Sequence, residues 1–183
     1  MEKNAPLKEN GCKLYIVISQ TGTWFSKVIK LFTKDPYNHS SISLNEDLTD
    51  MYSFGRKYTR LPLPGGFIQE CIGTKVFATH PKTTMIVYEL DVTKVQYNEV
   101  KNLIQQMRRQ KKIYAYNLLG IILMPLHKER KAQNKFYCSE FVKYVLIESK
   151  IVESDMLPVF CKPMDFLNIN GTKIYEGRMS AYG

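Results

Sequence analysis

Apolar and polar positions along the chain follow two periods, one typical of strands and one typical of helices. Strands are expected where short apolar, β-branched or alternating runs lie between turn residues: 14–18, 39–44, 51–54, 67–70, 75–79, 84–90 and 172–175. The second and third of these runs are separated only by a polar turn and predict a hairpin. The stretch 61–66 contains two prolines and two glycines and predicts a loop.

Helices are expected where apolar residues recur every three or four positions: 24–32, 94–111, 118–124 and 136–146. Thr93 and Gln96 form a capping-box pattern at the start of the second helix, and its basic end complements the helix dipole. Pro125 ends the third helix. The chain contains no repeat, linker or low-complexity segment. The pattern therefore predicts a single α+β domain spanning residues 1–183.

The last of these helices places Cys138 in its first turn. The apolar residues that follow recur on one helix face, which predicts a buried face: Phe141, Val142, Val145 and Leu146. Unpaired backbone N–H groups at the start of a helix favour an anion, so they lower the pKa of a thiol and provide donors for an oxyanion. A buried structural cysteine is the alternative, because free cysteine is among the most buried residue types.

Composition and charge narrow the class of protein and of partner. The chain of 183 residues is 44% hydrophobic, which is enough for a buried core and argues against disorder. Its net charge of +9 favours an acidic partner, such as nucleic acid, an anionic lipid surface or an acidic polymer. Basic residues cluster in 108–112 and 128–135, where a solvated face is the simpler interpretation. Neither cluster has interleaved aromatic residues, so nucleic acid is not expected, and weak contact with an anionic membrane surface stays open.

The cysteines and the apolar segments limit the cofactors and the compartment. The four cysteines form no Cys-x-x-Cys pair and have no histidine at a zinc-finger spacing: Cys12, Cys71, Cys138 and Cys161. No metal and no other cofactor is therefore expected. The start of the chain is polar, unlike a signal peptide, and the longest apolar stretch, 118–126, is shorter than the roughly 20 residues of a membrane span. We expect a cytoplasmic protein with free thiols.

The chain contains three histidines that are candidates for the base that a thiol nucleophile needs. His127 lies in a charged loop, and His80 precedes Pro81 in a turn. His39 opens a predicted strand and is the preferred base. The alternative is a histidine in the core or on the surface whose hydrogen bonds are satisfied and which has no part in catalysis.

The order of these segments resembles that of a known family. A strand and a helix are followed by the segments 37–44, 51–56 and 65–70, and the cysteine helix begins with the residues from Phe136 to Val142. This arrangement resembles the circularly permuted NlpC/P60 group of papain-like proteins, in its YiiX-like branch, where the histidine strand precedes the cysteine helix. The resemblance implies a papain-like antiparallel sheet packed against helices, and a site for thiol hydrolysis or acyl transfer.

The resemblance also implies roles for individual residues, with Cys138 as the nucleophile and His39 as its base. A third residue orients the histidine from a neighbouring strand, where many relatives carry a carboxylate and this chain has Tyr52 and Ser53. Ser53 is one candidate for this role, although a hydroxyl stabilises an imidazolium less than a carboxylate does. Glu70 is the other candidate, if its strand folds back toward the site.

Six residues are candidates for lining a substrate pocket. They lie at the end of the first strand or near the predicted site residues: Ser19, Gln20, Tyr52, Tyr114, Tyr116 and Tyr137. Each tyrosine combines an apolar ring with a polar tip, so partial burial in the core is the alternative interpretation.

These features lead us to expect a cysteine amidase or peptidase that acts on a small peptide or a cell-wall-derived fragment through a thioester. Two alternatives stay open. One is acyl or lipid chemistry on the same scaffold, as a hydrolase or an acyltransferase. The other is a binding module that keeps the fold without catalysis. The substrate within these classes and the oligomeric state are not determined by the sequence.

Overall fold

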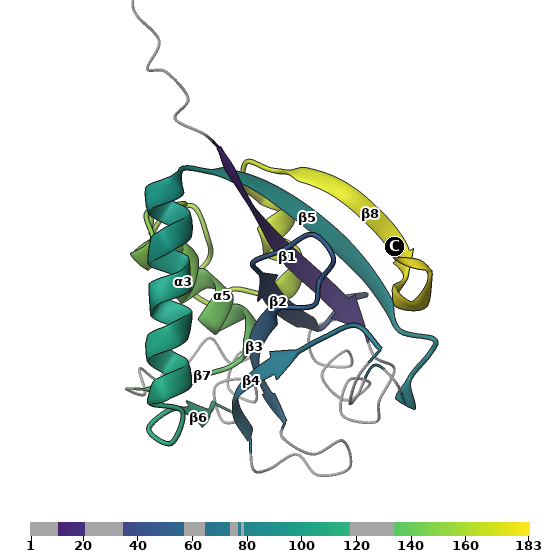
Figure 1. Ribbon diagram of the computed structural model, residues 1–183, viewed down its shortest axis with the longest axis horizontal. Coiled ribbons are helices and arrows are strands. Elements are labelled where there is room, and N and C mark those ends of the chain that lie inside the picture. The colour runs from purple at the N-terminus through teal and green to yellow at the C-terminus, as the bar shows by residue number, and fades with distance from the viewer. Residues whose placement is uncertain (1–10, 21–34, 57–64, 74–76, 78, 118–133) are drawn as a thin grey trace, which may run out of the picture.

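The computed structural model describes residues 11–20, 35–56, 65–73, 77, 79–117 and 134–183 (Figure 1). Its centre is a six-stranded antiparallel sheet with the order β4-β3-β2-β1-β5-β8. The strands of this sheet are β1 (Cys12–Gln20), β2 (His39–Ser43), β3 (Met51–Arg56), β4 (Gly65–Glu70), β5 (Thr84–Val92) and β8 (Thr172–Arg178). Together with its helices, the sheet gives a mixed α/β architecture that is compatible with the predicted α+β class.

Strand β1 lies in the middle of the sheet, and its side chains alternate between two apolar clusters. Leu14, Ile16 and Ile18 are fully buried on one face. Tyr15 and Val17 are buried in a second cluster on the other face. This alternation follows from the two-residue period of a strand. Pairing with β5 extends over all nine residues of β1, so the register is fixed along the whole strand.

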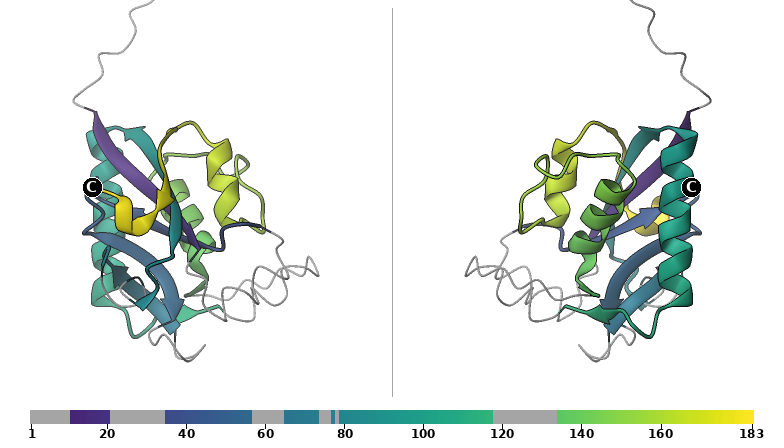
Figure 2. Two further views of the ribbon diagram at one scale, coloured as in Figure 1. Left: turned by 90° about the vertical axis from the view of Figure 1, so that its right-hand side faces the viewer. Right: turned by 90° about the vertical axis from the view of Figure 1, so that its left-hand side faces the viewer.

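Two helices pack on the face of the sheet that carries Leu14: α3 (Lys94–Arg109) and α5 (Cys138–Glu148) (Figure 2). The capping box predicted for α3 is present. Thr93 Oγ1 accepts a hydrogen bond from the Gln96 N–H at 3.2 Å, and Gln96 Oε1 accepts one from the Thr93 N–H at 2.9 Å. The helical spacing of apolar residues brings three side chains of α3 into the core: Val100, Ile104 and Met107.

Shorter elements complete the described structure. β6 (Ala115–Tyr116) and β7 (Lys135–Phe136) form a parallel pair that leads directly into α5. The 3₁₀ helix η2 (Pro163–Asn168) packs into the main core through Phe166. A second 3₁₀ helix, η3 (Met179–Ala181), contributes its first residue to the cluster on the opposite face.

Most of the predicted elements are confirmed. The segments that the structure confirms are the strands over 14–18, 39–44, 51–54, 67–70, 84–90 and 172–175 and the helices over 94–111 and 136–146. β2 and β3 pair as the predicted hairpin. The helices expected over 24–32 and 118–124 lie outside the described residues.

The loop predicted over 61–66 is wrong at its end, because Gly65 and Gly66 belong to β4. Both pair with β3, and Gly65 lies opposite Arg56. A Cβ at Gly65 would lie 2.6 Å from the Cβ of Tyr116. The glycine that indicated a turn is therefore a strand position where another side chain approaches the backbone closely.

The strand predicted over 75–79 is wrong at the two positions that the structure describes, since Phe77 and Thr79 are helical. The Phe77 side chain is buried in the cluster on the second face of the sheet. A short apolar run satisfies either period, so this segment did not distinguish a strand from a helical turn.

Candidate active site

Helix α5 begins at Cys138, and its first turn is held by contacts from outside the helix. The Tyr137 N–H donates to Glu140 Oε2 at 3.2 Å, and the side-chain amide of the buried Asn117 donates to the same oxygen at 3.2 Å. A carboxylate in the first turn also complements the helix dipole. Cys138 is 6% exposed, and its sulfur lies 3.9 Å from the backbone oxygen of Asn38. The start of α5 is thereby held against the start of β2.

His39 opens β2 and contacts both Cys138 and Glu70. Its Nε2 lies 3.0 Å from Glu70 Oε1 and 3.1 Å from Glu70 Oε2. A side-chain hydrogen bond joins His39 to Cys138. The three side chains form a chain of contacts in which the carboxylate fixes the orientation of the ring.

Glu70 reaches His39 across an intervening strand. It is the last residue of β4, and β3 separates β4 from β2. Ser53 and Gly55 lie two positions apart on β3, so they share one face, and both are small. A Cβ at Gly55 would lie 3.8 Å from His39 Cε1 and 2.9 Å from the Cδ1 of Ile68. The short side chains of β3 therefore leave the space through which the carboxylate and the ring meet.

The thiol and the imidazole have pKa values shifted in opposite directions. Burial raises the pKa of Cys138, but the hydrogen bond and the charge of His39 and the backbone N–H groups of Ser40 and Ser139 lower it more, so the net shift is downward. Burial lowers the pKa of His39, but Glu70 and Cys138 raise it more, to about 10. Both shifts favour a thiolate paired with an imidazolium over the neutral pair.

Two backbone N–H groups face the sulfur from different elements, Ser40 from β2 and Ser139 from the first turn of α5. Such donors stabilise negative charge on sulfur, and donors next to a nucleophile are also what a developing oxyanion needs. The site thus combines a thiol with a lowered pKa, an imidazole beside it and nearby N–H groups.

The structure corrects the prediction that Ser53 orients the histidine. The Ser53 hydroxyl is fully buried and donates to the backbone oxygen of Ser40 at 2.7 Å. It stabilises the start of β2 rather than the ring of His39, and the longer side chain of Glu70 takes the orienting position. Of the two residues that the sequence left as candidates, Glu70 is the one brought to His39.

Tyr52 and Tyr114 pack against the core of the described structure. The Tyr52 hydroxyl donates to Asp50 Oδ1 at 2.6 Å, and its ring stacks on Phe67 with centroids 5.7 Å apart. Tyr114 meets the edge of the Phe54 ring at 6.3 Å. The alternative interpretation, partial burial with a polar tip, describes both residues.

The remaining pocket candidates lie at the start of α5, at the end of β1 and on β6. Tyr137 is buried directly before Cys138, and burial raises the pKa of Tyr137. Ser19 is the partner of His39 in the β1–β2 register, and its buried hydroxyl has no hydrogen-bond partner within the described structure. Gln20 follows at the end of β1. Tyr116 pairs with Phe136 and packs against Gly65 at the start of β4.

Sequence reasoning missed the groups that hold the start of α5 against the start of β2. The backbone oxygen of Asn38 and the N–H of Ser40 flank His39, but the contacts of backbone groups depend on the tertiary fold. Glu140 carries a readable signal, because a glutamate three residues after the residue that precedes a helix is a capping position. Applied to Tyr137, that rule identifies the contact that holds the start of α5.

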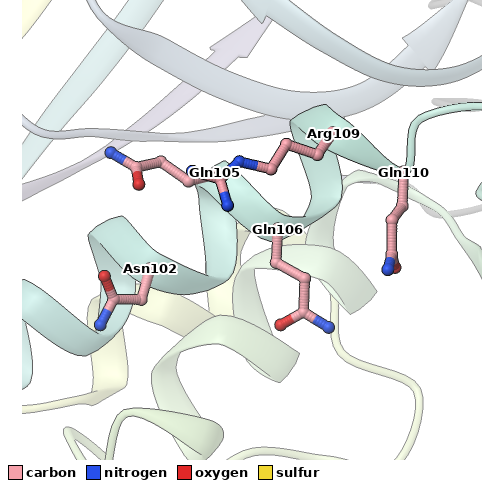
Figure 3. Close-up of a pocket in the computed structure, with 5 residues that line it drawn as sticks. All are labelled: Asn102, Gln105, Gln106, Arg109 and Gln110. Atoms are coloured by element: carbon pink, nitrogen blue, oxygen red, sulfur yellow. The ribbon is translucent and has the colours of Figure 1, made fainter.

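Other features of the described surface lie apart from this site. Figure 3 shows a hollow on the exposed side of α3, lined by Asn102, Gln105, Gln106, Arg109 and Gln110, and it includes none of the predicted site residues. No group of three or more His, Cys, Asp or Glu side chains that could hold a metal ion occurs among the described residues. Within the same ranges, no helix has the length and apolar character to cross a bilayer.

Comparison of the chain with models of protein families, with curated proteins and with solved structures finds no match in any of the three. The case for a function therefore depends on the geometry of Cys138, His39 and Glu70.

Proposed function

We propose that the chain is a cysteine hydrolase that cleaves an amide or peptide bond in a small cytoplasmic substrate, such as a peptide or a cell-wall-derived fragment, on a papain-like scaffold of the permuted NlpC/P60 type. The observation that carries the proposal is the contact chain from Cys138 through His39 to Glu70. A cysteine that only fills the core has no need of a partly buried imidazole and a carboxylate behind it. The order of a histidine strand before a cysteine helix supports the scaffold.

In this mechanism the Cys138 thiolate attacks the carbonyl carbon of the substrate and forms a tetrahedral intermediate. Backbone N–H groups near the sulfur, including that of Ser139, stabilise the oxyanion. The His39 imidazolium gives its proton to the leaving amine as the C–N bond breaks, which leaves a thioester on Cys138. His39 then takes a proton from water, which attacks the thioester and releases a carboxylic acid and the free thiolate. Glu70 keeps the ring oriented and stabilises its charged form.

The experiment that tests the proposal follows alkylation of each cysteine by iodoacetamide with peptide mass spectrometry, from about pH 5 to pH 10. Wild type is compared with His39→Ala, and the more exposed Cys12 and Cys71 serve as internal controls. We expect Cys138 to react fastest below about pH 7 and to lose that advantage without His39. Incubation with a panel of small amides and acyl esters then detects an acyl group on Cys138.

A Cys138 that reacts like an ordinary thiol with a pKa of about 8.5, or does not react, contradicts the proposal. The binding-module alternative is then favoured, and it makes its own prediction. Cys138→Ser should bind a candidate ligand as tightly as wild type does, while wild type turns over none of the panel.

A second candidate, lipid or acyl chemistry at the same site, is favoured by the turn that follows α3. Arg108 and Arg109 at the end of α3 and Lys111 and Lys112 in this turn are exposed, and the side chain of the adjacent Ile113 is 57% exposed. Basic residues around an exposed apolar side chain suit an anionic bilayer surface. This turn leads into β6, which pairs with β7 directly before α5.

Co-sedimentation with vesicles of phosphatidylcholine and phosphatidylserine tests this candidate at low and at high salt. Binding that is lost at high salt and in the variant with Lys111→Glu and Lys112→Glu supports it, because charge attraction to lipid is screened by salt. Absence of binding at both salt concentrations removes it, and leaves the small amide or peptide as the proposed substrate.

A further inference from the structure

We propose that Ser41 is a positioning residue of this site, which holds the Glu70 carboxylate in the plane where it meets His39. The inference rests on the proposed hydrolase function. The Ser41 hydroxyl donates a hydrogen bond to Glu70 Oε2, and its oxygen lies 3.4 Å from His39 Nε2. Since Glu70 Oε2 is itself 3.1 Å from that nitrogen, the three groups form a closed triangle.

The position of Ser41 on β2 explains how its hydroxyl comes to face the carboxylate. It lies two residues after His39, and residues two apart on a strand share one face. Its partner on β1 is Val17, and both are 1% exposed. Water does not reach a hydroxyl in such a place, so it requires a partner from the protein. The partner that the structure supplies is the carboxylate of Glu70.

Glu70 needs such a contact because of the path that it takes. Its side chain crosses β3 before it reaches the ring, and three rotatable bonds give it several ways to point. The bond to His39 fixes the carboxylate in one direction only. A second donor at Oε2 fixes the rotation of the carboxylate, and bonds to an ionised acceptor are the stronger kind.

Ser43 provides the comparison within the same strand. It lies on the same face of β2 and is fully buried, but its hydroxyl donates to the backbone oxygen of Asn45 at 2.8 Å, in the turn that follows. Ser43 therefore supports the hairpin, whereas Ser41 supports the site. Replacing each by alanine removes one buried hydroxyl from one strand, so the pair separates positioning from general stability.

The test measures the pH profile of iodoacetamide alkylation at Cys138 in wild type, Ser41→Ala, Ser41→Thr and Ser43→Ala, together with the melting temperature of each. With Ser41→Ala we expect the alkylation rate of Cys138 near pH 6 to fall about tenfold. The acid limb of the profile should move to higher pH by about one unit, as for the loss of a hydrogen bond to a charged group. Ser41→Thr keeps the hydroxyl and should retain the wild-type midpoint. Ser43→Ala should lower only the melting temperature.

Three results overturn the inference while wild-type Cys138 still shows its enhanced reactivity. In the first, the Ser41→Ala profile stays within about twofold of wild type or moves to lower pH. In the second, Ser43→Ala moves the midpoint as far as Ser41→Ala does. In the third, Ser41→Thr and Ser41→Ala move the midpoint of the profile equally. Loss of the enhanced reactivity in wild type would instead overturn the proposed function, so the two failures are distinguishable.

Discussion

Cys138 and Cys161 are both buried, at 6% and 0% exposure, yet their thiols lie in opposite environments. Burial alone raises the pKa of a thiol, and it does so at both positions. At Cys138 the hydrogen bond and the charge of His39 reverse the shift. At Cys161 the charge of Asp165 adds to the effect of burial, and the pKa stays well above its ordinary value. Burial is therefore a poor guide to reactivity, and the groups that face the sulfur decide it.

The two positions differ in backbone as well as in side chains. N–H groups face the sulfur of Cys138, one of them from the first turn of α5. A backbone carbonyl lies near each sulfur, that of Asn38 at 3.9 Å from Cys138 and that of Lys162 at 3.7 Å from Cys161, so the N–H groups are what distinguishes Cys138. N–H groups stabilise a thiolate and a carbonyl stabilises a protonated thiol. The same residue type is thus prepared for ionisation in one place and for retention of its proton in the other.

The largest expected effect comes from removing each sulfur in turn. Cys138→Ser should lower turnover of an amide substrate by at least about a thousandfold, because the hydroxyl is not ionised near neutral pH. Cys161→Ala should leave turnover unchanged and lower stability by about 1 kcal/mol, the cost of a small cavity. Steady-state kinetics and urea unfolding measure the two effects. Equal losses of turnover in both variants would contradict the distinction between the two thiols.

The next prediction concerns a variant in which the surroundings of Cys138 become like those of Cys161. With His39→Ala, burial acts on Cys138 without the opposing imidazolium, so its pKa should rise and its alkylation rate near pH 6.5 should fall about a hundredfold. His80→Ala is the matched control, because the ring of His80 contacts Thr79 and lies outside the site. A reactivity that survives His39→Ala would show that the helix start alone activates the thiol.

A smaller effect should follow from Glu70→Gln, which keeps the size of the side chain and removes its charge. The carboxylate raises the pKa of His39, so the pKa of the ring should fall in the variant. The alkylation rate near neutral pH should fall about tenfold as the imidazolium becomes less stable. Titration of the ring by NMR measures the pKa directly. An unchanged ring pKa would mean that the contact between Glu70 and His39 is not formed in solution.

The smallest effect concerns stability against pH. The pKa of His39 is raised from 6.5 to about 10, so its stabilisation is complete below pH 6.5 and is lost as the pH rises through about 10. The pKa of Cys138 is lowered from 9.0, so its stabilisation is complete above pH 9.0 and is lost as the pH falls through the lowered value. Between pH 9.0 and the higher of pH 6.5 and the lowered pKa of Cys138, the two trends cancel, because the ion pair and the unfolded neutral pair carry the same number of protons.

Urea unfolding should therefore show a contribution of the pair that is constant between those two values and falls on both sides, by about 1 kcal/mol over the first alkaline pH unit. The contribution is the difference between wild type and a variant with both His39→Ala and Cys138→Ala. Other groups that titrate in this range cancel in that difference. A contribution that changes steadily through the neutral range would show that only one of the two groups is ionised.

Most of the fold could be predicted from the sequence because its longest elements have a clear period. β1 and β5 are apolar runs, and α3 combines a capping box with regularly spaced buried residues. The errors lie where a local signal competes with tertiary pairing. Gly65 indicated a turn, yet it continues β4 because Tyr116 approaches its backbone. Such close approaches depend on residues far away along the chain.

The candidate site was only partly readable for the same reason. Cys138 and His39 stand out by their positions at the start of a helix and of a strand. The choice between Ser53 and Glu70 needed the strand order, which the sequence does not contain. The position of Ser41 is also informative, since its place two residues after His39 puts it on the same face of β2. A polar residue at that spacing from a candidate base is a natural partner for the base or for its carboxylate.

The three groups of the site come from a helix, an inner strand and the end of an edge strand, which are distant in the sequence. In a newly made or denatured chain nothing holds them together, and Cys138 is then an ordinary thiol that is mostly protonated at neutral pH. Folding itself therefore lowers the pKa of this thiol. Molecules that have not completed the sheet carry no activated sulfur, so they are protected from oxidation and from uncontrolled acylation. The rate at which Cys138 reacts is, in this sense, a measure of how much of the protein is correctly assembled.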